Sequence, residues 1–329
     1  MEIDASIIRP IAIAFALSLL ILVALLKTGA ARRLALDEPN QRSLHSVAVP
    51  RVGGIAIVLA LLIAWSITPG SSLVLGLLVA VLALTSAIDD RNGLPIALRL
   101  AVHGVAALFC AATLAPNDAY LIVLLMLYLV WMANCYNFMD GADGLAGGMA
   151  VFGFGAYGIA AHLAQQDAVA AMSLAPAAAA GAFLIFNFAP ARVFMGDAGS
   201  ISLGFAAAAL GAIGVQSSIW PAWFPLLVFS PFCVDASFTL LRRIRRGEPF
   251  WQAHRQHYYQ RLIRMGWSHR RTALCAYLLM AAVAASAVLG LHLEPGVQLV
   301  MLTGWCLIYA FLMRAIDLRW RASPESSRR

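Results

Sequence analysis

The chain has 329 residues, of which 62% are hydrophobic and only 12% are charged. A water-soluble domain of this size cannot hide so much apolar surface in one core, so the composition excludes an ordinary soluble fold and predicts an integral membrane protein. The net charge of +7 does not indicate a nucleic-acid binder, because basic residues alternate with aromatic ones in one segment only. We expect the lipid bilayer and an anionic substrate as partners, and no nucleic acid.

Apolar runs long enough to cross a bilayer follow one another along most of the chain. A hydrocarbon core of about 30 Å requires roughly 20 apolar residues in a helix. About eleven such runs are present, although 53–67 and 73–88 are short for a full crossing. The predicted fold class is all-α and polytopic, with one transmembrane domain over 1–320 and a short, basic, disordered tail over 321–329. The predicted spans are 7–26, 53–67, 73–88, 97–115, 119–135, 145–163, 169–188, 198–215, 222–240, 271–291 and 297–315.

Positive charge is distributed unequally between the loops on the two sides of these spans. One set of loops and the tail carry most of the arginines, whereas the other set holds Asp118, Asp167 and Glu294 with almost no basic residue. By the positive-inside rule, the arginine-rich side faces the cytoplasm. The N-terminus is therefore expected outside and the C-terminus inside.

Two adjacent carboxylates, Asp89 and Asp90, close the third predicted span. Neighbouring carboxylates repel each other unless a metal ion, a cation or a shared proton offsets their charge. Such pairs occur where Mg²⁺ binding or proton transfer is needed. A plain solvated helix end remains the alternative for this pair alone.

Polar residues recur every third position in the stretch NCYNFMDGADGLAGG. Asn134, Asn137, Asp140 and Asp143 would drift slowly along one face of a helix as it leaves the membrane, and could line a cavity there. Their oxygen atoms suit Mg²⁺, which takes a few protein ligands and completes its shell with substrate phosphate. A capped helix end with an Asp-Gly turn is the alternative.

Asp197 lies in the small-residue stretch FMGDAGS, directly before a helix predicted to begin near Ile201. The unpaired N–H groups and the positive dipole of a helix N-terminus favour a phosphate. Asp197 would then hold a metal ion that bridges this phosphate. An ordinary Asp or Ser helix cap would explain the same residues.

The longest polar loop carries the segment HRQHYYQR, from His254 to Arg261. Two histidines three residues apart suggest zinc, but no third ligand of the right type stands nearby. A cationic, aromatic segment that grips a diphosphate fits better, with a lipid-surface patch as the alternative.

A basic, turn-rich loop joins the first two predicted spans. It reads PNQRSLH, which includes His45, and then PRVGG. The double glycine, Gly53-Gly54, opens the second span. Alone, this loop is weakly specific.

These five segments, in this order from about Asp37 to Arg261, resemble the polyprenyl-phosphate N-acetylhexosamine-1-phosphate transferase family. The resemblance implies that a polyprenyl phosphate attacks the β-phosphorus of a UDP-sugar and releases UMP, with Mg²⁺ as cofactor and Mn²⁺ as its substitute. HRQHYYQRL resembles the WecA-like branch that initiates O-antigen, with UDP-N-acetylhexosamine and undecaprenyl phosphate as partners, more than the muramoyl-pentapeptide branch. The site would face the cytoplasm at the bacterial inner membrane, with the N-terminus in the periplasm. A homodimer is compatible with this reading.

The resemblance also implies a role for each matching residue. Asp197 would be the main Mg²⁺ ligand, with Asn137 beside it. Asp89 and Asp90 would lie near the lipid phosphate, one of them as its base, and Arg99 stands where many members have a lysine. The catalytic candidates are Asp89, Asp90, Asp140 and Asp143, and the substrate-binding candidates are Asn134, Asn187, His254, Arg255, His257, Arg261, His45 and Arg99.

Two other classes of protein stay open on the residues alone. A secondary transporter would also be polytopic and glycine-rich, but its ionisable residues would lie near the bilayer midplane on broken helices. A non-catalytic scaffold would not require the regular Asp and Asn spacing. The clustering of motif residues at one membrane face favours an enzyme over both.

Overall fold

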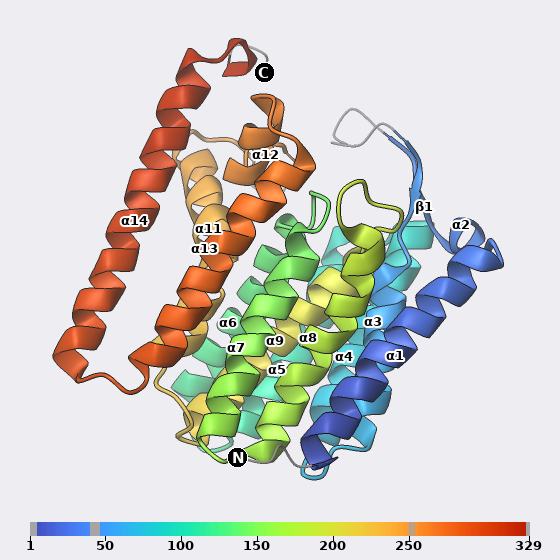
Figure 1. Ribbon diagram of the computed structural model, residues 1–329, viewed down its shortest axis with the longest axis vertical. Coiled ribbons are helices and arrows are strands. Elements are labelled where there is room, and N and C mark those ends of the chain that lie inside the picture. Colours follow the sequence, from blue (N-terminus) through green and yellow to red (C-terminus); the bar gives the residue numbers. More distant parts are fainter. Residues whose placement is uncertain (1–4, 40–46, 250–251, 253, 327–329) are drawn as a thin grey trace.

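A computed structural model of the chain describes residues 5–39, 47–249, 252 and 254–326, and it is almost entirely helical (Figure 1). Two short strands, β1 (Leu36–Asp37) and β2 (Val49–Pro50), pair antiparallel in the first loop. The prediction of an all-α fold is confirmed. In chain order the helices are α1 (Ala5–Lys27), α2 (Ala30–Leu34), α3 (Gly53–Ser66), α4 (Leu73–Asn92), α5 (Ile96–Leu114), α6 (Ala119–Phe138), α7 (Leu145–Leu163), α8 (Asp167–Asn187), α9 (Asp197–Gln216), α10 (Trp223–Val228), α11 (Ser230–Arg245), α12 (Tyr258–Arg264), α13 (His269–Gly290) and α14 (Pro295–Ala322), followed by the 3₁₀ turn η1 (Pro324–Ser326).

Within the described residues, nine helices are long and apolar enough to cross a membrane, namely α1, α4 to α9, α13 and α14. Helix α3 is apolar but has only 14 residues. The run predicted as a span over 222–240 is divided into α10 and α11 at Phe229. Pro231 explains the division, because it has no N–H group to continue the helical hydrogen bonds across the junction.

Helix α9 forms the centre of the bundle (Figure 1). Its sequence is rich in alanine and glycine, nearly all of its residues are buried, and it packs against α3, α4, α6 and α7. A side chain at Gly204 would collide with the backbone of Met132 and Ala133 in α6. Small residues allow such close backbone contact, which helps helices associate in lipid. Because α9 begins at Asp197, this packing fixes that residue at one end of the bundle.

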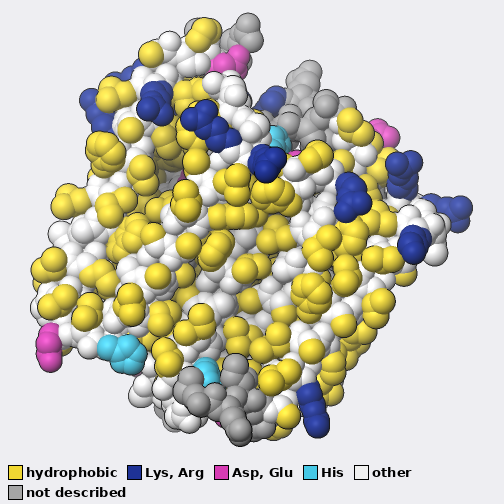
Figure 2. Space-filling view, in the orientation of Figure 1, with side chains coloured by type: hydrophobic (Ala, Val, Ile, Leu, Met, Phe, Trp, Pro, Cys, Tyr) yellow, Lys and Arg dark blue, Asp and Glu magenta, His cyan; other side chains and the backbone are white. Residues whose placement is uncertain are grey.

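The surface divides into an apolar body and a basic end. Figure 2 shows hydrophobic side chains across the middle of the molecule and Lys and Arg side chains gathered mainly towards the end where α2, α12 and the C-terminus lie. Large side chains such as Leu73, Leu124 and Leu278 are exposed on the body. Exposure of this kind is expected of side chains that face lipid, and arginine at one end is the pattern of a cytoplasmic side.

Candidate active site

Acidic and amide side chains from three helix ends and one loop meet at the basic end of the bundle. Oδ2 of Asp90, in the last turn of α4, accepts a hydrogen bond of 3.2 Å from the N–H of Asp197, the first residue of α9. Asn137, near the end of α6, donates its side-chain amide to the Asp197 carboxylate. Asp140, in the loop after α6, accepts from the N–H of Gly196. We call Asp90, Asn137, Asp140 and Asp197 the acid cluster; the structure assembles it from three separate sequence motifs.

The loop that leads into Asp197 is held by the start of α3. The N–H groups of Gly53 and Gly54 donate to the carbonyl oxygens of Phe194 and Met195, at 2.9 and 2.8 Å. A side chain at Gly54 would overlap the backbone of the first turn of α9. The double glycine thus permits backbone contact between the N-termini of α3 and α9. This contact fixes the loop that leads into Asp197 of the acid cluster.

In the described part of the chain, Arg51 forms an ion pair with the acid cluster. Its Nη1 lies 3.8 Å from Oδ1 of Asp90, and its Nη2 donates to Asp37 at 2.6 Å. Burial and the nearby Asp197 carboxylate raise the pKa of Asp140 well above its ordinary value, and Arg51 opposes this increase only in part. The three carboxylates of the acid cluster therefore share the Arg51 guanidinium with Asp37.

The acid cluster offers the kind of donor atom that Mg²⁺ prefers. Carboxylate and amide oxygens suit a hard cation, which at phosphate-transfer sites binds one or two carboxylates and otherwise water and substrate oxygens. No three His, Cys, Asp or Glu side chains of the described residues converge closely enough to enclose a metal ion by themselves. The protein can therefore supply part of a Mg²⁺ shell, and a substrate phosphate would supply the rest.

The two adjacent aspartates have different partners. Asp89 accepts hydrogen bonds of 2.6 Å from Nη1 of Arg99 and 2.6 Å from the N–H of Leu94. Asp90 instead faces Arg51 and the rest of the acid cluster. Different arginines face the two carboxylates, Arg99 at Asp89 and the shared Arg51 at Asp90, and both offset the repulsion expected from their adjacency. Asp89 also joins the end of α4 to α5.

The polar stripe predicted along α6 is shorter than expected. The helix ends at Phe138, so Asp140 and Asp143 lie in the following loop, and the prediction that all four polar residues share one helical face is wrong. The cause is the Asp-Gly pair, which favours a turn. Asn134 does not join the acid cluster; its side chain donates to the carbonyl oxygen of Val130 at 2.7 Å.

Asp143 and Asn187 connect loops at the edge of the site. The two carboxylate oxygens of Asp143 lie 3.0 Å from Nδ1 of His269 and 3.0 Å from a backbone N–H in the loop 188–196. Asn187 accepts from the N–H of Gly144 at 2.9 Å and donates to a carbonyl oxygen of the same loop at 2.9 Å. These side chains fix the walls of the site, and Asn187 is itself buried.

Helix α12 places the histidine segment beside the acid cluster. Asp235 of α11 accepts hydrogen bonds from the N–H groups of Tyr258 and Tyr259 at 2.9 and 3.1 Å, and its carboxylate lies 3.2 Å from Nδ1 of His257. The Tyr259 hydroxyl donates to the carbonyl oxygen of Phe138 at 3.1 Å. The segment thus contacts the helix end that carries Asn137.

The other candidates of this segment lie in different surroundings. The ring of His254 stacks on His257 with centroids 4.8 Å apart. Burial lowers the pKa of His254 to about 3, and nearby His257 and Arg243 act in the same direction, so the ring is neutral at physiological pH. Arg255 is half-buried next to it. Arg261 is buried and turned to Asp317 of α14, 2.9 Å away, so it can act on a substrate only through α12.

Asp235 and Asp317 were missed by the sequence reasoning, although they hold both sides of α12. Each is the single acidic residue of its helix. Burying such an acid near a membrane costs free energy unless a cation or a hydrogen-bond donor pairs with it, so a single acid in these helices is itself an indication of a paired residue.

His45, a substrate-binding candidate, lies outside the described residues.

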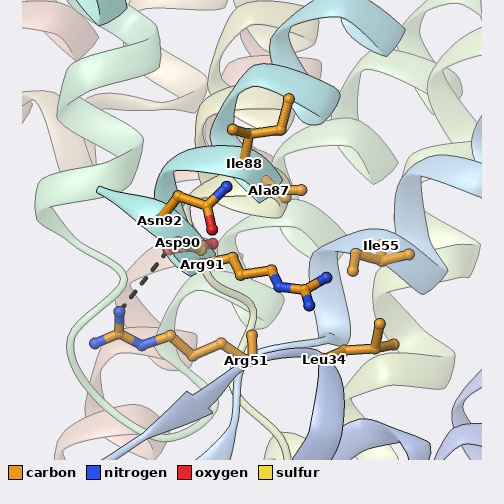
Figure 3. Close-up of a pocket in the computed structure, with 10 residues that line it drawn as sticks. Leu34, Arg51, Ile55, Ala87, Ile88, Asp90, Arg91 and Asn92 are labelled. Atoms are coloured by element: carbon orange, nitrogen blue, oxygen red, sulfur yellow. Dashed lines mark ion pairs between the residues drawn. The ribbon is translucent and has the colours of Figure 1, made fainter. Parts of the chain in front are cut away.

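A cavity of about 510 Å³ opens beside the acid cluster, between α2, α3, α4 and the start of α9 (Figure 3). One part of its wall is polar and another is apolar. Figure 3 shows Arg91 extending from α4 towards Leu34 and Ile55, and the ion pair between Arg51 and Asp90. We call it the headgroup cavity; Arg51, Asp90 and Arg91 form its polar wall, and Leu34, Ile55 and Ile88 its apolar wall.

Known proteins resemble the chain along most of its length. The model of the family "Glycosyl transferase family 4" matches residues 72–215. A protein named probable undecaprenyl-phosphate N-acetylglucosaminyl 1-phosphate transferase in Bacillus subtilis is 29% identical over 310 residues, covering 87% of this chain and 86% of that protein. The undecaprenyl-phosphate alpha-N-acetylglucosaminyl 1-phosphate transferase of Yersinia pestis is 30% identical over 322 residues, covering 87% and 85%. The decaprenyl-phosphate N-acetylglucosaminephosphotransferase of Mycolicibacterium smegmatis is 27% identical over 342 residues, covering 89% and 84%.

Proposed function

Because the chain belongs to the polyprenyl-phosphate N-acetylhexosamine-1-phosphate transferases of glycosyl transferase family 4, we propose that it transfers an N-acetylhexosamine 1-phosphate from a UDP-sugar to undecaprenyl phosphate. The observation that carries this proposal is the headgroup cavity, which meets the acid cluster at Asp90. An oxygen of the lipid phosphate forms a bond to the β-phosphorus of the UDP-sugar. The bond from that phosphorus to the bridging oxygen breaks, and UMP leaves.

The headgroup cavity suits the lipid acceptor. Arg51 and Arg91 offer positive charge to a phosphate, and guanidinium groups bind phosphate oxygens through paired hydrogen bonds. Leu34, Ile55 and Ile88 offer an apolar surface to the first isoprene units. Asp90 lies in the polar wall beside these arginines, and there it would orient the phosphate and take its remaining proton.

The acid cluster suits the diphosphate of the donor. Asp197 and Asn137 would hold Mg²⁺, which when bound offsets the negative charge of the diphosphate. The N-terminus of α9 adds its positive dipole at the same place. Asp140 would keep its position through the N–H of Gly196, and so maintain the shape of the loop before α9.

The histidine segment suits the nucleotide-sugar side. His254, Arg255 and His257 lie directly before α12, whose Tyr259 contacts the end of α6 that carries Asn137. A neutral His254 can donate or accept a hydrogen bond without adding charge. The site would then open to the cytoplasm, where UDP-sugars are made, and the reaction would initiate O-antigen or another envelope polysaccharide.

Release of UMP tests this function. Membranes containing the chain, with undecaprenyl phosphate and Mg²⁺ added, are incubated separately with UDP-GlcNAc, UDP-GalNAc, UDP-FucNAc and UDP-N-acetylmuramoyl-pentapeptide. UMP and a lipid-linked product should appear with one of the first three donors and only when the lipid is present. Turnover of the pentapeptide donor alone would assign the chain to peptidoglycan synthesis, and no turnover with any donor would refute the proposal.

A further inference from the structure

Helix α14 stands at the edge of the molecule and adds little to its core (Figure 1). Of its side chains only Tyr309 is buried, and its main contacts are with α12, α13 and η1. It also lies beyond the residues that match the family model. Gln298, Trp305 and Tyr309 make polar contacts along the helix, but the ion pairs of α14 with other helices lie in its last turns, at Asp317.

Asp317 joins three helices through one carboxylate. Arg242 of α11 donates through Nη1 at 2.9 Å and Nη2 at 2.6 Å, and Arg261 of α12 donates through Nη1 at 2.9 Å. The hydroxyl of Tyr258 lies 3.4 Å from the same carboxylate. A bidentate, charge-assisted arrangement of this kind fixes orientation as well as distance.

Two further residues cover the outer side of α12. The guanidinium of Arg261 lies between the rings of Tyr258 and Trp320, 5.2 and 5.6 Å from their centroids. Arg264 lies 4.8 Å from the Trp320 ring and 3.2 Å from the carboxylate of Glu325 in η1. Arginine stacks well on aromatic faces. The contacts of Arg261 and Arg264 with Trp320 therefore limit movement of α12 along α14 as well as away from it. We call Asp317, Trp320 and Glu325 the α14 clamp.

The inner side of α12 rests on the acid cluster's own helix and loop. Tyr259 bonds to Phe138, and a side chain at Gly141 would overlap the Tyr259 hydroxyl. Helix α12 has only seven residues, and a helix this short does not hold its conformation without tertiary contacts. Its position therefore depends on the contacts at both sides.

We propose that α14 positions the nucleotide-sugar side of the site: Asp317, as a positioning residue, seats α12 so that Tyr259 holds the end of α6 and the following loop, where the acid cluster would bind the donor. This inference rests on the proposed function. The headgroup cavity is formed by α2, α3, α4 and α9, whereas the α14 clamp contacts arginines of α11 and α12. Loss of the clamp should therefore weaken donor binding and spare acceptor binding.

Separate KM values for the two substrates test the inference. Asp317→Ala should raise KM for the UDP-sugar about tenfold or more and change KM for undecaprenyl phosphate less than about twofold, as expected when an interaction used in binding one substrate is removed. Asp317→Glu should restore most of the affinity. Arg314→Ala, exposed one turn away on the same helix, is the matched control and should resemble the wild type.

The outcomes separate this inference from the proposed function. If the wild type releases UMP but Asp317→Ala has an unchanged KM for the UDP-sugar, or raises both KM values equally, the inference is wrong and the function stands. If the wild type releases no UMP, the proposed function fails first. Should Asp317→Ala not accumulate as a folded protein, Arg261→Lys gives the same comparison, because lysine keeps the charge but loses the planar stacking; an unchanged donor KM in that variant would also refute the inference.

Discussion

At the scale of single residues, the role of each carboxylate follows from its partners. Asp89 and Asp90 are neighbours in the chain, yet one is engaged by Arg99 and the other belongs to the acid cluster. Asp143 and Asp235 have similar chemistry but hold loops and a helix start. Asp89, Asp143 and Asp235 hold helix ends and loops together, whereas the three carboxylates of the acid cluster lie close enough to one another to favour a bound cation.

Replacing Asp197 with Asn should reduce kcat by at least about 100-fold, because an amide keeps the size of the side chain but not the charge that binds a divalent cation. UMP release as a function of Mg²⁺ concentration measures the effect. Asp118→Asn is the control, since Asp118 caps α6 at the opposite end of the bundle. Near-normal turnover of Asp197→Asn at low Mg²⁺ would contradict the assignment.

Asp90→Asn should lower turnover more than Asp89→Asn, because only Asp90 lines the headgroup cavity. A phosphate monoester loses its second proton near pH 6, so a base for the lipid phosphate matters most below that pH. Activity of Asp90→Asn, relative to wild type, should therefore recover between about pH 5.5 and pH 8. A flat ratio over this range would leave Asp90 with an electrostatic role only.

At the scale of elements, the site depends on how closely helix ends approach one another. The start of α3 lies against the start of α9 with no side chain between them at Gly54. Two hydrogen bonds from this turn hold the loop before Asp197. Backbone cannot move aside as the tip of a flexible side chain can, so the contact tolerates no added atom.

Gly54→Ala should therefore destabilise the protein by about 1–3 kcal/mol, the usual range for overpacking, and reduce activity as the loop before Asp197 shifts. Thermal unfolding in detergent and UMP release give the two measurements. The matched control is Gly155→Ala in α7, where an added Cβ meets no atom within 4 Å. That change should be neutral or stabilising, since alanine is the better helix former; equal behaviour of the two variants would contradict the packing argument.

At the scale of the whole molecule, the chemistry is confined to one end of the bundle. The acid cluster, the headgroup cavity and α12 all lie where the arginines gather (Figures 1 and 2). A transporter would instead need ionisable residues near the middle of the membrane. This one-sided arrangement favours a reaction at the membrane surface. It also predicts that the chain has a single orientation across the membrane.

Cysteine labelling with a membrane-impermeant reagent tests the orientation. Ser268→Cys should react only when the cytoplasmic side is accessible, and Asn117→Cys should react from the outside; both positions are exposed. Reaction of the wild-type chain, whose exposed Cys275 and Cys306 lie in predicted spans, gives the background. Labelling of Ser268→Cys from outside would invert the topology and separate the site from cytoplasmic UDP-sugars.

Much of this organisation could be predicted from the sequence, because apolar length and short motifs are local properties. The all-α polytopic class, the family and most long helices are confirmed. The partners of Asp89 and Asp90, the end of α6 at Phe138 and the roles of Asp235 and Asp317 could not be predicted. They depend on which helices meet in space, and the sequence around a single acid in a helix does not indicate which residue pairs with it.

The burial of α9 has a consequence for how motion is distributed in the molecule. Amide hydrogens in the core of a structure exchange with water only through rare, large openings, whereas those at the edge exchange through local ones. The helix that begins with Asp197 should therefore be among the last to exchange, whereas α12, which is held only by contacts at its two sides, should exchange earlier than α9 once those contacts open. A centre that opens rarely and a short helix that depends on its neighbours would let related chains change donor while leaving the centre untouched.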